Sequence, residues 1–228
     1  PSFSECFKII EAMVKAGVDL MELQIPFSEP IADGPTILKA NQVALQGGVS
    51  ISECLDFAAD VANTFEIPFL AMTYFNIVFR YGVGPFVSAM AEKGLQGAII
   101  ADLPPEEGDD YLEAMKHANL NPIFIFSPTT SEERMRYIAS RGTGFIYCVA
   151  RKGVTGARTS FSQRLAHYLA RCRRATSLPL AVGFGVKSNR DVDFLKGKAD
   201  IAVIGSQLIR VFEEKGIGNV EDFVSALR

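Results

Sequence analysis

Glu22 is the first residue whose type and setting suggest chemistry. It stands inside the apolar run VDLMELQI (18–25), where an ionisable side chain is costly unless it is paired or functional. Side-chain alternation along a strand places Glu22 on one face and its neighbours Met21 and Leu23 on the other. Two interpretations follow: a carboxyl for general acid–base catalysis, or a buried carboxylate in a structural ion pair.

A second carboxyl, Asp33, lies in the following loop, which is dense in proline and glycine. Taken alone, an aspartate in such a loop is best interpreted as a turn or capping residue. From the residues alone, the turn or capping interpretation of Asp33 is favoured over a catalytic one.

Two glycine-bearing segments predict a phosphate site. GFGVKSNRDV (183–192) and IGSQLIRVF (204–212) each place glycine and serine between an apolar run and a helical pattern. Exposed amides at a helix N-terminus attract an anion, and glycine lets the backbone approach the ligand closely. A third segment, ARKGVTGARTSFS (150–162), has the small polar residues and flanking arginines of a mobile loop that closes over a ligand. The alternative for that segment is an exposed linker.

The elements that must position these residues are short apolar runs alternating with helical patterns. The runs are apolar on both faces, as parallel strands covered by helices are. Helices are expected at 4–17, 50–65 and 109–120, with Ser4 and Ser50 as N-caps and Gly17 as a C-cap. The expected strands are 18–25, 67–75, 97–103, 122–127, 144–150, 178–184 and 200–206.

This alternation leaves two architectures, a closed barrel or a doubly wound open sheet. We expect an α/β fold of the TIM (β/α)8 barrel type, as a single domain over residues 1–228. Because only seven runs are present and the chain opens in a helix, this requires a first strand upstream of Pro1, whereas an open sheet does not. In a barrel the carboxyl ends of the strands form the active site, and the glycine junctions become the seventh and eighth.

Composition excludes several function classes. A chain of 228 residues with net charge −3 has the size of one barrel domain and no basic field for nucleic acid or an acidic membrane. No apolar run approaches the ~20 residues of a membrane span, and the first residues do not resemble a signal peptide. The scattered cysteines predict no metal site and a reducing, cytoplasmic location; they are Cys6, Cys54, Cys148 and Cys172.

The motif ELQIPFSEPIADGPTI (22–37) closely resembles the signature of the tryptophan synthase α-subunit family. ADLPPEE (101–107), RKGVTG (151–156), GFGV (183–186) and IGS (204–206) follow in that family's order. The resemblance runs from Pro1 to the C-terminus. It implies reversible cleavage of indole-3-glycerol phosphate into indole and glyceraldehyde 3-phosphate, without a metal or cofactor in this chain. It also implies an α2β2 complex in which indole passes to a pyridoxal-phosphate β subunit.

The resemblance further implies the roles of individual residues. Glu22 protonates C3 of the indole and manages the glycerol hydroxyl, while Asp33 accepts a hydrogen bond from the indole N–H. An apolar surround is expected to raise the pKa of Glu22 towards neutrality. Tyr147 neighbours the glutamate, Thr155 bridges to Asp33, and Arg151 belongs to the closing loop. The phosphate is held by Gly156, Gly185, Gly205 and Ser206, with Phe184 beside them.

The surface that meets the β subunit is implied in the same way. It comprises the loop Pro26–Pro30, Asn76 and Asp102, with Pro26, Phe27 and Pro30 exposed. The alternative for that loop is a rigid turn around a single buried phenylalanine.

The sequence also departs from the family pattern. Gln24 stands where glycine is usual, Glu29 where aspartate is usual, Thr129 where asparagine follows proline, and Met72 where leucine is usual. A bulky Gln24 beside the acid is a reason to consider a catalytically weak subunit that acts chiefly as an allosteric partner of β. Another phosphate-binding barrel enzyme, such as a sugar-phosphate isomerase, is the remaining alternative because it shares the last two junctions.

Overall fold

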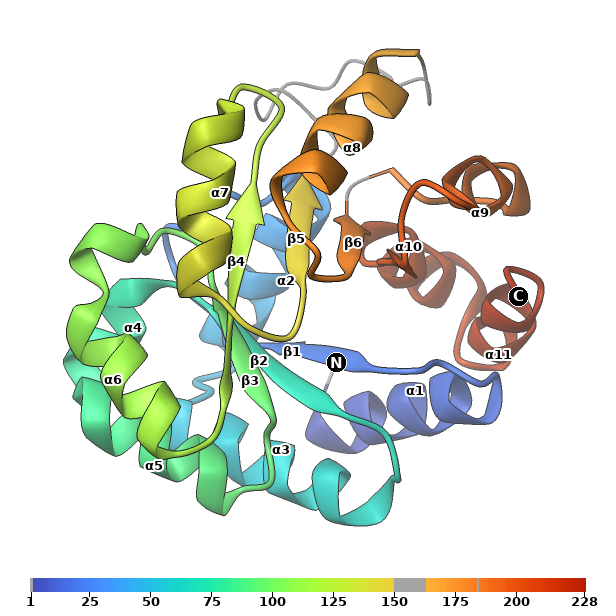
Figure 1. Ribbon diagram of the computed structural model, residues 1–228. Coiled ribbons are helices and arrows are strands. Elements are labelled where there is room, and N and C mark those ends of the chain that lie inside the picture. Colours follow the sequence, from blue (N-terminus) through green and yellow to red (C-terminus); the bar gives the residue numbers. More distant parts are fainter. Residues whose placement is uncertain (1, 150–162, 184) are drawn as a thin grey trace.

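Seven parallel strands form one sheet whose order is the order of the chain. The structure, a computed structural model, describes residues 2–149, 163–183 and 185–228. The sheet curls, and its helices lie on the outer side (Figure 1). The strands are β1 (Met21–Gln24), β2 (Phe69–Thr73), β3 (Gly97–Ile100), β4 (Asn121–Phe126), β5 (Ile146–Val149), β6 (Leu180–Gly183) and β7 (Ile201–Ala202).

The connections are helical, and in the described part of the chain two of them, after β1 and after β2, contain two α-helices each. Two further helices follow the last strand, β7. The helices are α1 (Phe3–Lys15), α2 (Pro35–Gln46), α3 (Ile51–Thr64), α4 (Phe75–Tyr81), α5 (Val83–Glu92), α6 (Asp109–His117), α7 (Glu132–Arg141), α8 (Gln163–Ala175), α9 (Asn189–Leu195), α10 (Ser206–Lys215) and α11 (Gly218–Ser225), with a 3₁₀ turn η1 (Pro105–Glu107).

The two faces of the sheet bury different apolar clusters. An inner cluster fills the concave side, and two larger clusters lie between the sheet and the surrounding helices. Alternation puts Leu70 in the inner cluster and its neighbours Phe69 and Ala71 in an outer one. The members of the inner cluster are Leu70, Ile99, Ile123, Phe145, Tyr147 and Ala181.

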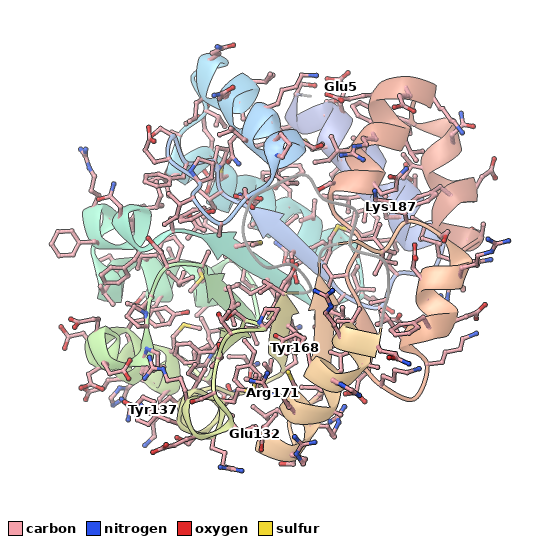
Figure 2. All side chains as sticks on the ribbon, turned by 90° about the horizontal axis from the view of Figure 1, so that it is seen from above. Glu5, Glu132, Tyr137, Tyr168, Arg171 and Lys187 are labelled. Atoms are coloured by element: carbon pink, nitrogen blue, oxygen red, sulfur yellow. The ribbon has the colours of Figure 1, made fainter. Side chains whose placement is uncertain are left out.

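The barrel expectation is confirmed, and the open-sheet alternative is wrong. A doubly wound sheet reverses its strand order and carries helices on both faces, whereas this order is sequential and side chains fill the inner face. Strands β1 and β7 do not pair with each other within the described residues. Helix α1 packs against α11 and α2 against α10, so helices bridge the two ends of the sheet, and from above they ring the strands (Figure 2).

Local capping signals explain where the first helices begin. Ser50 caps α3: its Oγ accepts from Glu53 N (3.2 Å), and the Glu53 carboxylate accepts from Ser50 N (2.8 Å). The expected N-cap Ser4 is wrong, because Ser2 and Glu5 form the same reciprocal pair two residues earlier. At the other end of α1, Ala16 is the C-cap, and Gly17 follows with φ 87°, as glycine does after a helix.

Helix α8 braces the carboxyl end of β4 (Figure 2). Tyr168 donates its hydroxyl hydrogen to the carbonyl of Phe126 (2.8 Å), and Arg171 donates to the carbonyl oxygens of Pro128 (3.3 Å) and Thr130. The unusual Thr129 lies in this loop and shares a hydrogen bond with the Ser127 hydroxyl (2.9 Å). The departure is therefore accommodated by local hydroxyl pairing.

None of the helices in the described part of the chain is both long enough and apolar enough to cross a bilayer.

Candidate active site

The described residues that were predicted to do chemistry all line one large cavity, which includes the carboxyl ends of the strands and also extends to α1, α3 and the C-terminus. The predicted residues Arg151, Thr155, Gly156 and Phe184 and the expected loop 150–162 lie outside the described residues. Those brought together are Glu22, Asp33, Tyr147, Gly185, Gly205 and Ser206. The barrel topology therefore does what the sequence predicted, because parallel strands deliver their loops to the same end.

Glu22 projects from β1 into this cavity. Met21 and Leu23 on either side pack into the outer cluster, so Glu22 faces inward. Its Oε1 is buried and accepts no hydrogen bond from the described residues, and none of the ion pairs found among them includes Glu22. Burial raises the pKa of this carboxyl to about 7. Among the described residues Glu22 therefore has no partner for a structural ion pair. Its raised pKa instead suits a carboxyl that gains and loses a proton near neutral pH.

Asp33 is 6% exposed and is held by two donors. Its Oδ2 accepts hydrogen bonds from Gln24 Nε2 (2.8 Å) and Tyr74 Oη (3.0 Å). Burial raises the pKa of the carboxyl, and these two bonds oppose that rise. The N-cap of α2 is Gly34, which forms no side-chain cap. Asp33 does lie in a turn, since its amide donates to the carbonyl of Pro30 (3.0 Å). Its side chain does not cap α2, however, and the carboxylate instead bonds to Gln24 and Tyr74.

Tyr147 lies close enough to both carboxyls to feel their charges, and it lines the same cavity. It is buried in β5, and its pKa is raised well above the ordinary value by burial and then by the charges of Glu22 and Asp33. Gly183 in β6 makes room for it, since a Cβ at that position would collide with the Tyr147 ring and hydroxyl. A glycine inside a strand signals such a close approach, but the partner was not evident from the sequence.

Substitution of Gly183 by alanine is expected to lower the free energy of unfolding by about 1–3 kcal/mol, because the added methyl group overpacks a buried site. Urea unfolding followed by circular dichroism measures this. The matched control is Gly84→Ala on the exposed side of α5, where an added Cβ meets nothing within 4 Å; alanine should not destabilise a helix at that position. Equal stability of the two variants would contradict the packing of Tyr147 against Gly183.

The two glycine junctions differ in the amides that they offer. Gly185 has φ 116°, a conformation that favours glycine, at the end of β6. Just beyond it, however, the amides of Lys187 (2.9 Å) and Ser188 (3.0 Å) donate to Asp191 Oδ2 and are occupied. At the next junction Gly205 is the N-cap of α10, forms no side-chain cap, and faces open space. The N-terminus of α10 is therefore the principal candidate for an anion.

The loop after β1 is partly buried, contrary to expectation. Pro30 is buried, and Phe27 stacks on Tyr74 with ring centroids 5.2 Å apart. The exposure expected for Phe27 and Pro30 is thus wrong, because the aromatic pair anchors the loop. The apolar residue presented to solvent is Ile31, which is 72% exposed and was not singled out from the sequence.

Helix α4 presents a second exposed apolar side chain. Asp102 Oδ1 accepts from the amide of Phe75 (2.6 Å) and so caps the helix that carries Asn76. Phe79 on the same helix is 69% exposed, which also escaped sequence analysis. A large exposed aromatic side chain is typical of a protein contact surface.

The arrangement combines a carboxyl that titrates near neutral pH, a second carboxylate set beside it and an open helix N-terminus. Among the described residues no group of three or more His, Cys, Asp or Glu side chains is placed to hold a metal ion. These groups can transfer a proton and stabilise positive charge on a substrate whose anionic end binds at α10.

Comparison with known proteins gives the same family throughout the chain. A family model described as "Tryptophan synthase alpha chain" matches residues 1–226. A tryptophan synthase alpha chain of Desulforapulum autotrophicum is 61% identical over 227 residues, covering 100% of this chain and 90% of the relative. That of Syntrophotalea carbinolica is 60% identical over 228 residues, with the same coverage.

Solved structures give the same result at lower identity. One from a study of mutual activation in the tryptophan synthase α2β2 complex of Pyrococcus furiosus has a TM-score of 0.92 and 31% identity, covering 100% of this chain and 93% of that chain. A Mycobacterium tuberculosis tryptophan synthase structure has a TM-score of 0.90 and 32% identity, covering 99% and 85%.

Proposed function

The chain belongs to the tryptophan synthase alpha chain family, and on that premise we propose that Glu22 and Asp33 carry the cleavage of indole-3-glycerol phosphate into indole and glyceraldehyde 3-phosphate. The observation that carries this proposal is the buried Glu22 Oε1, which no described residue pairs. Its carboxyl, with a pKa of about 7, both donates and accepts a proton near neutral pH.

The reaction requires protonation of C3 of the indole ring. Glu22 delivers this proton, and the ring becomes a cation with its charge shared by the ring nitrogen. The bond from C3 to the glycerol carbon then breaks, and its electron pair restores the indole. Glu22, now deprotonated, accepts the proton of the glycerol hydroxyl as the carbonyl of glyceraldehyde 3-phosphate forms, which returns the acid to its starting state. Asp33, ionised and hydrogen-bonded to the ring N–H, stabilises the positive charge.

The phosphate of the substrate binds at Gly185, Gly205 and Ser206 in this proposal. The uncapped N-terminus of α10 supports it, since helix amides and the helix dipole favour an anion there. The family resemblance further assigns Thr155, Gly156 and Phe184 to substrate binding and Arg151 to a loop that closes over the ligand, and all four lie outside the described residues.

Replacing Gly205 by alanine is expected to raise KM about tenfold with little change in kcat, because uniform binding is lost. The added Cβ meets no atom of the described residues within 4 Å, so the chain should fold, while the methyl group occupies space next to the phosphate. Steady-state kinetics measures this, with Gly218→Ala on α11, also free of close neighbours, as the control. An unchanged KM, or a ligand-bound structure with the phosphate elsewhere, would refute the site.

Product analysis tests the activity itself. The chain incubated with indole-3-glycerol phosphate should release indole and glyceraldehyde 3-phosphate in equal amounts, with and without a metal chelator. Release of neither product would refute the proposed function.

The partner in this proposal is a tryptophan synthase β subunit in an α2β2 complex. Indole is small and apolar, so docking against a β subunit keeps it from escaping to solvent. The exposed Ile31 and Phe79 support a contact surface at the carboxyl end of the sheet.

We place the reaction in the cytoplasm, because the four cysteines are free thiols, as is usual in a reducing compartment.

A further inference from the structure

Gln24 is the inward-facing residue that follows Glu22 on β1. Side chains two apart on a strand share a face, and Gln24 lines the same cavity as Glu22. Its amide does not turn towards the acid. Instead Nε2 donates to Asp33 Oδ2 at 2.8 Å, joining the end of β1 to the loop beyond it.

The two donors to Asp33 converge on one oxygen. Tyr74 Oη also donates to Oδ2, at 3.0 Å, and no described residue donates to Oδ1. A carboxylate held by two donors at one oxygen has its plane fixed. Its other oxygen is left to accept a hydrogen bond from a ligand in the cavity.

Tyr74 is itself fixed by its surroundings. Its hydroxyl accepts from the amide of Ala32 at 3.0 Å, and its ring stacks on Phe27. The Phe27 amide in turn donates to Asn41 Oδ1 at 3.1 Å. The loop therefore has anchors on β2 and α2, and Gln24 adds an anchor on β1 that acts on the carboxylate itself.

We propose that Gln24 is a positioning residue for Asp33. Before substrate binds, the Gln24 amide orients the Asp33 carboxylate so that Oδ1 is free to accept a hydrogen bond from the indole N–H. This inference rests on the proposed function, in which Asp33 receives that hydrogen bond. A glycine at position 24 has no donor, and an asparagine is one methylene shorter. The side chain that departs from the family pattern thus serves the second carboxyl and leaves Glu22 unpaired for proton transfer.

Several titratable and charged groups surround Asp33. Glu22 is on β1, Tyr74 follows β2, Asp102 follows β3, and Tyr147 is on β5. Arg210 on α10 bonds to Thr36 near the start of α2. Glu22 has a pKa of about 7, so a residue-specific measurement is needed to follow Asp33 alone.

The test uses Gln24→Met, which keeps the length of the side chain and removes the donor. Carbon-13 NMR of the full chain with labelled aspartate carboxyls gives the Asp33 titration, assigned by its loss in Asp33→Asn. Removing a donor to an ionised group should raise the pKa of Asp33 by about one pH unit. The acid limb of kcat/KM should move up equally, because Asp33 must be ionised to stabilise the cation.

At a pH on that limb, kcat/KM should fall about tenfold. Gln96→Met, an exposed position at the amino end of β3, is the matched control and should leave both curves unchanged. Tyr74→Phe removes the other donor, should shift Asp33 in the same direction, and serves if Gln24→Met does not fold.

An Asp33 titration that is the same in the substituted and unsubstituted chains would overturn the proposal. So would a shifted titration with an unmoved acid limb. The NMR experiment needs no substrate, so its result is separate from the proposed function, which falls if the unsubstituted chain releases no indole.

Discussion

Replacing Glu22 by glutamine is expected to abolish cleavage of indole-3-glycerol phosphate, with a fall in kcat of about a thousandfold or more. A positioned general acid contributes on the order of 10²–10⁴-fold, and an amide neither donates an acidic proton nor takes one back. The rate of indole release at saturating substrate measures this. Turnover like that of the unsubstituted chain would remove Glu22 from the mechanism.

The stability of the same variant shows whether its loss of activity comes from misfolding. The pKa of Glu22 is about 7 in the folded chain against 4.5 ordinarily, so the folded state holds this proton more tightly. Stability is therefore lost as pH rises from about 4.5 to 7, by roughly 3 kcal/mol in all. Glu22→Gln should remove that loss and be more stable than the unsubstituted chain at pH 8 in urea unfolding, while Glu66→Gln at an exposed position should not.

Replacing Asp33 by asparagine is expected to lower kcat/KM about a hundredfold or more. Gln24 and Tyr74 both donate to one oxygen of Asp33, so the asparagine oxygen is drawn to that side. Its NH₂ group then faces the indole N–H, donor against donor, and the positive charge on the ring loses its counterion. A fall of this order corresponds to about 3 kcal/mol of transition-state stabilisation.

Steady-state kinetics of Asp33→Asn, with circular dichroism to show that the chain is folded, measures this effect. Glu29→Gln in the same loop is the control, because Glu29 is exposed and absent from the cavity lining. Unchanged kinetics in Asp33→Asn would place the charge stabilisation elsewhere.

The sequence predicted the fold and the principal carboxyl because those rest on patterns within single elements. Runs apolar on both faces predicted buried parallel strands, and the isolated Glu22 within one of them indicated a carboxyl that is either functional or part of a buried ion pair. Asp33 alone was ambiguous, since a loop aspartate has many local partners. Only the resemblance separated the functional interpretation from a turn or cap.

The remaining features depend on contacts between distant segments, which periodicity does not encode. The pairing of Gln24 with Asp33 depends on how the loop folds back over β1. The sequence alone therefore suggests, wrongly, that Gln24 acts on Glu22. The fit of Tyr147 against Gly183 depends on the register of β5 and β6. The amides of Lys187 and Ser188 donate to Asp191 in a capping box. They are therefore not available to a phosphate, which the glycine pattern alone does not indicate. Burial of Pro30 and exposure of Ile31 were likewise set by the stack of Phe27 on Tyr74.

The most direct test of the account is the rate of indole release from indole-3-glycerol phosphate, measured while a tryptophan synthase β subunit is titrated into the chain. Asp33 shares its loop with the exposed Ile31, so a partner that favours the ordered loop should raise the rate. The account predicts measurable release by the chain alone and a severalfold rise that saturates with complex formation. Complex formation without indole release at any β concentration would contradict the account. The chain would then be a subunit that acts only as an allosteric partner of β.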